Sequence, residues 1–283
     1  SPSLTRDQAR ITYLGQQFPN PFRGLDPIYG ANITRANLLR PYPEFGDINV
    51  LRPIGYSWYH SLQSRIERRF ENGFTFQFSH TWSKTMEAVE FLNPADSRPS
   101  EVVSGLDRTI RWTMSGVWEL PFGKGRRWGS DAHAIVDLLA GGWQLGGMGQ
   151  TQSGAPLAFG NRIFRGNLAD INLASDERGV DRWFNTAAGF ERNASQQLAS
   201  NIRYMPLRFN GVRGPGQNRV DLSLIKNFKM TERFVTQFRA ETYNAFNHVN
   251  LANPNVDPTS GAFGQITGQD PPKSWQFALK VSF

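Results

Sequence analysis

The last ten residues of the chain alternate between large apolar and small or polar side chains. The apolar positions are Trp275, Phe277, Leu279, Val281 and Phe283. An alternation with a period of two predicts a β-strand with one apolar face. A strand of about ten residues with such a face fits a strand that crosses a membrane. The last strand of a soluble β-sandwich is the alternative.

The same alternation predicts further strands along the chain. We expect them at residues 54–70, 74–84, 108–120, 143–153, 218–228 and 233–246, before the terminal strand. Asn72 and Gly73 separate the first two and suit the positive φ angles of a tight hairpin turn. Residues 132–140 fit a short helix. The sequence therefore predicts an all-β, antiparallel fold of about seven strands.

The connections between these strands differ in length. Those at 71–73 and 229–232 are short, 121–142 is intermediate, and the loops at 85–107, 154–217 and 247–273 are long. The longest loop should contain small elements of its own, near 181–188 and 200–209. Long loops at one end and short turns at the other are typical of transmembrane β-barrels. We therefore expect an extracellular loop end and a periplasmic turn end.

The chain divides into two regions on this interpretation. Residues 51–283 hold the barrel strands, whereas residues 1–50 contain several prolines that disfavour central strands. We expect residues 1–50 to form an irregular, extracellular loop segment.

Composition agrees with a barrel. Aromatic residues make up 13% of the chain, and the mean hydropathy is −0.47, as expected where only alternate strand residues face lipid. Cysteine is absent, which excludes disulfides and thiolate metal sites. The formal charge of +7 leaves open a soluble basic module that binds polyanions. The basic residues are mostly scattered, which favours a solvated or headgroup-facing rim and no nucleic-acid partner.

No motif for catalysis, cofactor binding or metal binding is found. The histidines, His60, His80, His133 and His248, lack the spacing of a zinc site. Ser153 lacks the flanking glycines of a nucleophile elbow. We therefore expect neither an enzyme nor a cofactor.

The polar faces of the strands carry charges of both signs. If the apolar faces meet lipid, the lumen is lined by Arg111, Glu119, Asp221, Arg239, Glu241 and Lys280. Mixed signs favour a salt-bridged wall or a surface that contacts a plug over a selectivity site. Tryptophans near strand ends or on outward faces should form aromatic girdles at the membrane interfaces.

Seven stretches, in order, resemble a known family. They are Tyr59–Gln63 with Arg68–Phe70, Phe78–Lys84, Glu119–Gly125, Gly142–Leu145, Gln152–Pro156, Glu241–His248 and Gln276–Phe283. The ordered set resembles the C-terminal part of TonB-dependent outer-membrane receptors, specifically the Oar-like group with a carboxypeptidase-regulatory-like N-terminal domain.

The resemblance implies a receptor in the outer membrane of a Gram-negative bacterium. Such a receptor takes up a bound nutrient, using energy from a TonB-type inner-membrane protein where the full receptor is present. The terminal stretch resembles the signal read by the barrel assembly machinery, with Phe283 as its key aromatic. Outer-membrane lipid is the implied surrounding.

The sequence shows no plug domain, and these receptors have about 22 strands. We therefore expect a C-terminal portion, one piece of a split receptor that another chain completes, or a small derived barrel. The alternative function is a receptor-derived, all-β structural or surface interaction protein without transport activity.

Overall fold

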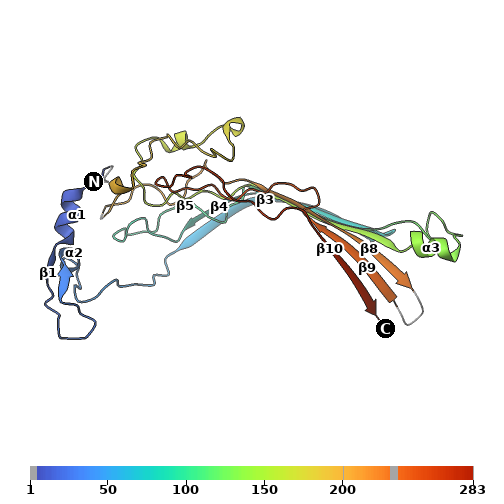
Figure 1. The fold of residues 1–283 in the computed structure, drawn as a ribbon, viewed down its shortest axis with the longest axis horizontal. Coiled ribbons are helices and arrows are strands. Elements are labelled where there is room, and N and C mark those ends of the chain that lie inside the picture. Colours follow the sequence, from blue (N-terminus) through green and yellow to red (C-terminus); the bar gives the residue numbers. More distant parts are fainter. Residues whose placement is uncertain (1–4, 200, 230–234, 283) are drawn as a thin grey trace.

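The computed structural model describes residues 5–199, 201–229 and 235–282. Its main feature is one antiparallel sheet whose strands follow the order β10-β9-β8-β7-β6-β4-β3, with the short β5 paired to β4 (Figure 1). The strands are β3 (Tyr56–Glu71), β4 (Phe74–Ala88), β5 (Val102–Val103), β6 (Ile110–Glu119), β7 (Trp143–Gln152), β8 (Gln217–Lys229), β9 (Val235–Tyr243) and β10 (Ser274–Ser282). The all-β, antiparallel prediction is confirmed.

The turn between β3 and β4 shows why the sequence forms hairpins. Asn72 has a φ of 53° and Gly73 a φ of 78°, as predicted. A Cβ atom on Gly73 would stand 3.2 Å from the Cβ of Glu119 on β6, so the turn also lacks room for a side chain. The predicted strands agree with the observed ones within a few residues. The largest difference is β4, which continues to Ala88 because its outer end pairs with β3 and β5.

Long loops and short turns lie at opposite ends of the sheet. Figure 1 shows helix α3 (Ala134–Ala140) and the adjoining ends of β8 and β9 at one end, while the long loops gather at the other. This arrangement has the predicted distribution of loop lengths. No helix in the described part of the chain is long and apolar enough to cross a membrane.

The strand register gives the sheet one apolar and one polar face. Residues on the apolar face, from β3 to β10, include Leu62, Ile66, Phe78, Trp82, Trp112, Met114, Leu145, Val220, Leu222, Leu224, Phe238, Phe277 and Leu279. Many stay uncovered: Phe277 is 65% exposed and Leu279 68%. No second sheet lies on this face in the described residues. This argues against the sandwich, because a sandwich buries its apolar faces against each other.

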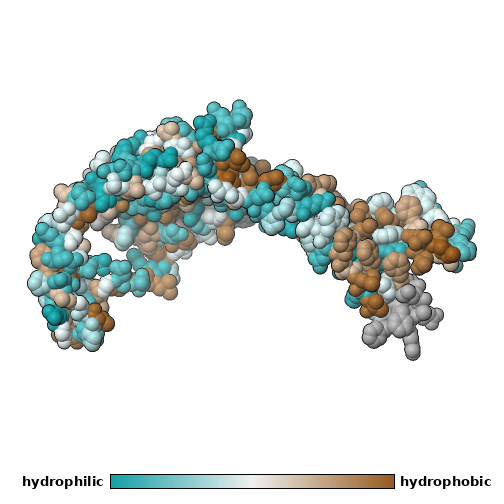
Figure 2. All heavy atoms as spheres, in the orientation of Figure 1, coloured by the Kyte–Doolittle hydropathy of each residue, from teal (hydrophilic) through white to brown (hydrophobic). Residues whose placement is uncertain are grey.

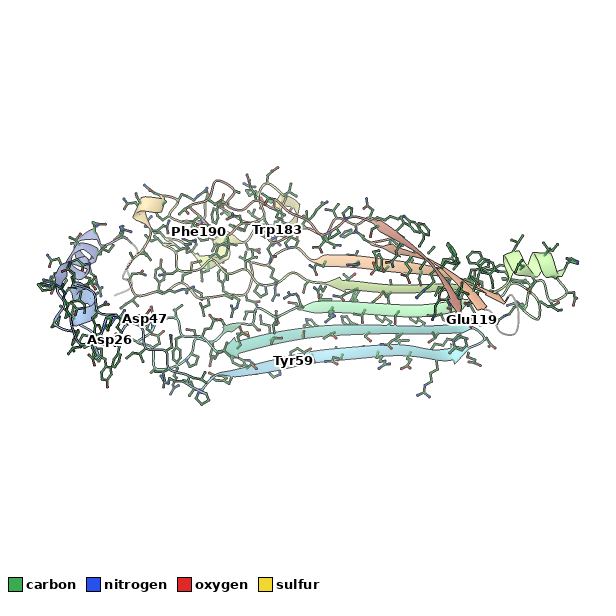
Figure 3. All side chains as sticks on the ribbon, turned by 60° about the horizontal axis from the view of Figure 1, so that its bottom comes forward. Asp26, Asp47, Tyr59, Glu119, Trp183 and Phe190 are labelled. Atoms are coloured by element: carbon green, nitrogen blue, oxygen red, sulfur yellow. The ribbon has the colours of Figure 1, made fainter. Side chains whose placement is uncertain are left out.

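The buried core lies in the loops instead of on the sheet. It consists of Leu157, Phe159, Phe164, Ile171, Phe184, Phe190, Met205, Val212 and Phe263. The ring centroids of Phe159 and Phe184 are 5.1 Å apart, and those of Phe164 and Phe190 are 4.8 Å apart. We call this assembly of residues 153–199, 201–216 and 244–273 the loop cap. Figure 3 places Phe190 and Trp183 in it, far from Glu119 at the turn end.

The small elements of the longest loop differ from the prediction. Three 3₁₀-helices occupy Leu168–Ile171, Ser175–Glu177 and Ala194–Gln196. The predicted positions near 181–188 and 200–209 are wrong for the described residues, which form turns, bends and isolated bridges there. Side chains of the aromatic core hold those segments, so they need no regular backbone pattern.

Residues 5–50, expected to be irregular, contain short elements of their own. These are α1 (Gln8–Gly15), β1 (Gln17–Pro19), β2 (Asn32–Thr34) and α2 (Arg35–Leu38), with β1 and β2 paired antiparallel. The guanidinium of Arg35 lies 3.9 Å from the ring centre of Tyr13, and Arg6 donates to the carbonyl of Gln197 in the loop cap. The segment therefore lies at the long-loop end.

Candidate ligand-binding face of the sheet

The register places all six predicted lumen residues on the polar face of the sheet. Several have partners there. Arg239 forms an ion pair with Glu241 at 3.1 Å, Glu119 pairs with Arg126 at 3.0 Å, and Arg111 donates to Gln150 at 3.3 Å. Lys280 lies opposite Gln237 in the β9–β10 register. The ion pairs are observed, whereas the assignment of this face to the wall of a lumen stays a prediction.

Two of the six residues line the same hollow. Asp221 and Glu241 line a space of about 400 Å³. Its polar lining also includes Thr75, Gln77, Ser115, Ser223 and Tyr243. Arg111, Glu119 and Lys280 lie outside it. Gly146 of β7 lies opposite Ser223 on this face, and a Cβ atom there would meet the hydroxyl of Ser223 that lines the hollow.

Arg219 is the main residue of this face that sequence reasoning missed. Its Nε lies 3.0 and 3.1 Å from the two carboxylate oxygens of Asp221, and its guanidinium lies 5.9 Å from the ring centre of Tyr243. It lines two further hollows, of about 360 and 520 Å³, together with Asn250 and Asp270. Arg219 precedes Asp221 by two residues on β8, so the strand alternation already places both side chains on the same face.

Asn250 and Asp270 reach this face through the loop after β9. Asn250 accepts a hydrogen bond from the amide of Asn218 at 2.7 Å and donates to its carbonyl at 2.9 Å, which ties the loop to β8. The amide of Asp270 donates to the carbonyl of Asn250 at 2.8 Å. Asn244 begins the loop with a φ of 51°, and its backbone amide donates a hydrogen bond to the carboxylate of Asp221. No strand pattern could have revealed these partners.

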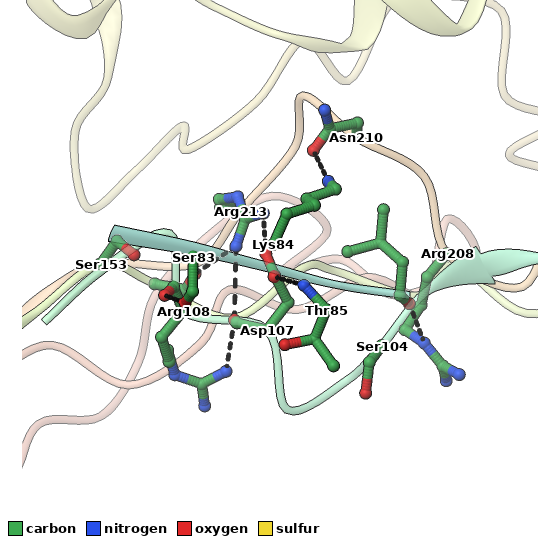
Figure 4. A network of polar contacts seen from close by, with 12 residues as sticks. Ser83, Lys84, Thr85, Ser104, Asp107, Arg108, Ser153, Arg208, Asn210 and Arg213 are labelled. Atoms are coloured by element: carbon green, nitrogen blue, oxygen red, sulfur yellow. Dashed lines mark hydrogen bonds and ion pairs between the residues drawn. The ribbon is translucent and has the colours of Figure 1, made fainter. Parts of the chain in front are cut away.

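A buried polar network joins the loop cap to the sheet (Figure 4). The carboxylate of Asp107 is fully buried, pairs with Arg213 of the cap and accepts from the amide of Thr85 on β4 at 2.6 Å. Beside it, Arg208 of the cap pairs with Glu87 of β4 at 2.5 Å. Both carboxylates lie at the long-loop end of β4. The network therefore fixes the cap at that end of the sheet.

The predicted assembly signal lies on the apolar face of β10. Trp275, Phe277, Leu279 and Val281 are between 54% and 68% exposed. The rings of Trp275 and Phe277 stack with centroids 6.0 Å apart. Phe283 lies outside the described residues. β10 forms one edge of the sheet and β3 the other.

The polar face offers hydrogen bonding and ion pairing to a ligand. It presents the guanidinium of Arg219, the carboxylates of Asp221, Glu241 and Asp270, and the hydroxyl of Tyr243. Among the described residues, no group of three or more histidine, aspartate or glutamate side chains could hold a metal ion.

A family model described as an outer membrane beta barrel domain matches residues 5–276. No curated protein and no solved structure matches the chain. The match spans both the sheet and the loop cap, and the apolar face left uncovered by protein is the one a barrel turns toward lipid. The chain therefore belongs to the outer membrane beta barrel domain family, and the protein is located in the bacterial outer membrane.

Proposed function

We propose that this protein is a component of an outer-membrane receptor and transporter of the TonB-dependent type, which binds a nutrient and takes it up through its barrel. One observation carries the proposal: hollows with polar side chains lie along the polar face of the sheet and continue up to the loop cap. Asp221 lines the hollows of about 400 and 360 Å³, and Arg219 lines those of about 360 and 520 Å³.

The chemistry of these hollows favours a polar ligand. Arg219 and Asp221 neutralise each other, and Arg239 and Glu241 do the same nearby. A face of paired charges has little net field, so it selects ligands that make many hydrogen bonds rather than simple ions. An oligopeptide or an oligosaccharide has this character.

Further strands must complete the barrel on this proposal. Within the described residues, the outer edges of β3 and β10 have no partner strand. Unpaired backbone groups are costly in lipid, so membrane barrels close. We propose that strands from outside the described sheet, in this polypeptide or in another chain, pair with both edges. Barrel assembly machinery would recognise the terminal strand, and a TonB-type protein would supply energy to the complete receptor.

The experiment compares bacterial cells with and without this protein in a defined mixture of oligopeptides and oligosaccharides. Mass spectrometry measures which compounds leave the medium. The proposal predicts a loss that requires this protein and stops when the TonB-type protein is depleted. The variant Arg219→Gln should weaken the uptake, whereas Arg182→Gln, an exposed change in a cap turn, should leave it unchanged.

A surface interaction role is the second candidate. It is favoured by the loop cap, whose aromatic core makes it a stable platform for recognition. On this alternative the cells bind a compound but never deplete it through TonB-dependent uptake. Retained surface binding without uptake would replace the transport proposal with this one.

A further inference from the structure

The connection between β6 and β7 is unlike the tight β3–β4 turn at the same end of the sheet. It spans residues 120–142 and contains helix α3, whose large side chains are exposed although they are apolar. Ile135 is 64% exposed, Val136 53%, Leu138 49% and Leu139 67%. Figure 2 shows hydrophobic surface gathered at the end of the molecule that carries α3. If this helix lay in water, these large apolar side chains would all be in contact with solvent.

The sheet holds the C-terminal end of this helix beside its apolar face. Lys226, which the β7–β8 register places on that face next to Trp143, is buried and donates to the carbonyls of Gly141 and Leu139. The indole of Trp143 donates to the carbonyl of Leu139 at 2.9 Å. A cation at a helix C-terminus is favourable because the last carbonyls point toward it. The helix is thus fixed on the side of the sheet that meets lipid.

The rest of the connection is folded around one carboxylate. The Oδ1 atom of Asp137 accepts from the amide of Lys124 at 2.6 Å. A Cβ atom on Gly123, whose φ is 110°, would stand 2.5 Å from that same oxygen and 2.6 Å from the Cα of Gly141. The turn and the helix therefore form one unit, and Asp137 faces inward while its apolar neighbours face outward.

Aromatic and basic side chains flank the helix. Trp128 is 50% exposed, contacts Phe122 with ring centroids 5.2 Å apart, and lies 5.6 Å beneath the guanidinium of Arg127. Within the described residues, neither Lys124 nor Arg127 has an ion-pair partner. Exposed tryptophan and arginine beside apolar side chains are the residues that meet lipid headgroups at a membrane interface.

We propose that the β6–β7 connection is a lipid anchor. Helix α3 lies in the interface of the leaflet at the short-turn end, with Ile135, Leu138 and Leu139 among the acyl chains. Lys124 and Arg127 contact the phosphates of phospholipid headgroups. Two observations select lipid over a protein partner: the patch continues the apolar face of the sheet, and its charge complements phosphate. The assignment of this leaflet to the periplasmic side follows the topology argued from loop length.

The absence of cysteine permits a direct test. Nitroxide labels are placed singly at Leu138→Cys, at Leu62→Cys on the apolar face of β3 and at Ser175→Cys in the loop cap. The protein is studied in bilayers of phosphatidylethanolamine and phosphatidylglycerol. Oxygen, which concentrates in lipid, and a water-soluble nickel chelate then report the surroundings of each label. We expect the labels at positions 138 and 62 to be several-fold more accessible to oxygen than to the chelate. The label at position 175 should be more accessible to the chelate.

Two results would overturn the anchor. A Leu138 label that follows Ser175 means that the helix projects into water. A label shielded from both reagents means that protein covers the helix. If Leu62 also favours the chelate, the membrane-spanning arrangement itself fails, which is a distinguishable outcome.

The headgroup contacts are tested by Lys124→Gln with Arg127→Gln, using Arg182→Gln as the control. Spin-labelled phosphatidylglycerol reports the fraction of lipid immobilised on the protein. The proposal predicts that the double variant loses part of the immobilised fraction, while the apolar face of the sheet keeps the rest, and that the control loses none. An unchanged fraction would contradict the phosphate contacts.

Discussion

The buried carboxylate of Asp107 pairs with the guanidinium of Arg213, which lies 106 residues further along the chain. The side chain of Asp107 has no solvent exposure, and that of Arg213 has 18%. This pair joins the loop between β5 and β6 to the loop cap. The cap is therefore attached to the sheet by a charge that cannot reach water.

Arg213→Gln should release the cap. The substitution leaves the carboxylate of Asp107 buried without its cation, a change that costs about 3–5 kcal/mol where a buried pair loses one partner. Hydrogen exchange of the cap amides measures the free energy of local opening. Arg40→Gln removes the exposed Arg40–Asp47 pair and should change that free energy by less than about 1 kcal/mol. Equal effects of the two variants would show that the buried pair does not hold the cap.

Gly154 marks a second point of attachment. A Cβ atom there would stand 1.8 Å from the carbonyl oxygen of Gly214, so the backbones of the two cap ends touch. Gly154→Ala should destabilise the cap by about 1–3 kcal/mol through overpacking. Gly179→Ala is the matched change, because open space surrounds that position and its φ is not in the left-handed region. Limited proteolysis of the cap separates them, and equal cleavage rates would contradict the close approach.

Acid should loosen the cap through two carboxylates. The backbone amide and hydroxyl of Thr259 lower the pKa of Asp257, and the amide of Asn193, with the guanidinium of Arg165, lowers the pKa of Glu191. A lowered folded pKa means that the charged form stabilises the cap. This stability is complete above the ordinary values of 3.8 and 4.5 and is lost as the pH falls through the lower folded values.

Hydrogen exchange between pH 5 and pH 3 checks this behaviour. Opening of the cap around these residues should increase toward the acid end of the range. The double variant Asp257→Asn and Glu191→Gln should start less protected and respond less to pH. An identical pH response in both proteins would exclude these carboxylates as the cause.

The apolar face of β10 should reject charge, and its polar face should accept it. Leu279→Lys places an amine on the exposed apolar face, at a cost of about 2–4 kcal/mol near the bilayer midplane. Gln276→Lys places the same amine opposite Glu241 on the polar face, where a small change is expected. Denaturant unfolding from lipid bilayers compares the two. A larger loss for Gln276→Lys would reverse the assignment of the faces.

The sequence was most informative about the sheet. Alternation from Phe74 to Trp82 and from Trp275 to Val281 identifies the strands and their faces, because side chains of a strand repeat with a period of two. The same rule placed Asp221 and Glu241 on one face. Their shared hollow could not be predicted, since it depends on the register of strands that are distant in sequence.

The packing of the loop cap could not be predicted from the alternation of side chains. Phe159, Phe184 and Phe263 come from separate segments without periodicity, and their packing depends on tertiary contacts alone. The pairs Asp107–Arg213 and Glu87–Arg208 have no local signature either. Asn250 and Asp270, which line hollows together with Arg219, come from the loop after β9 and have no such signature.

The central claim is that one face of the sheet meets lipid and the other faces water inside a barrel. Single cysteines at positions 220, 221, 222, 223 and 224 of β8 test it directly, in outer membranes treated with a charged, water-soluble thiol reagent. The account predicts an alternating result: Asp221→Cys and Ser223→Cys react, whereas Val220→Cys, Leu222→Cys and Leu224→Cys do not. Uniform reactivity, or the opposite alternation, would contradict it.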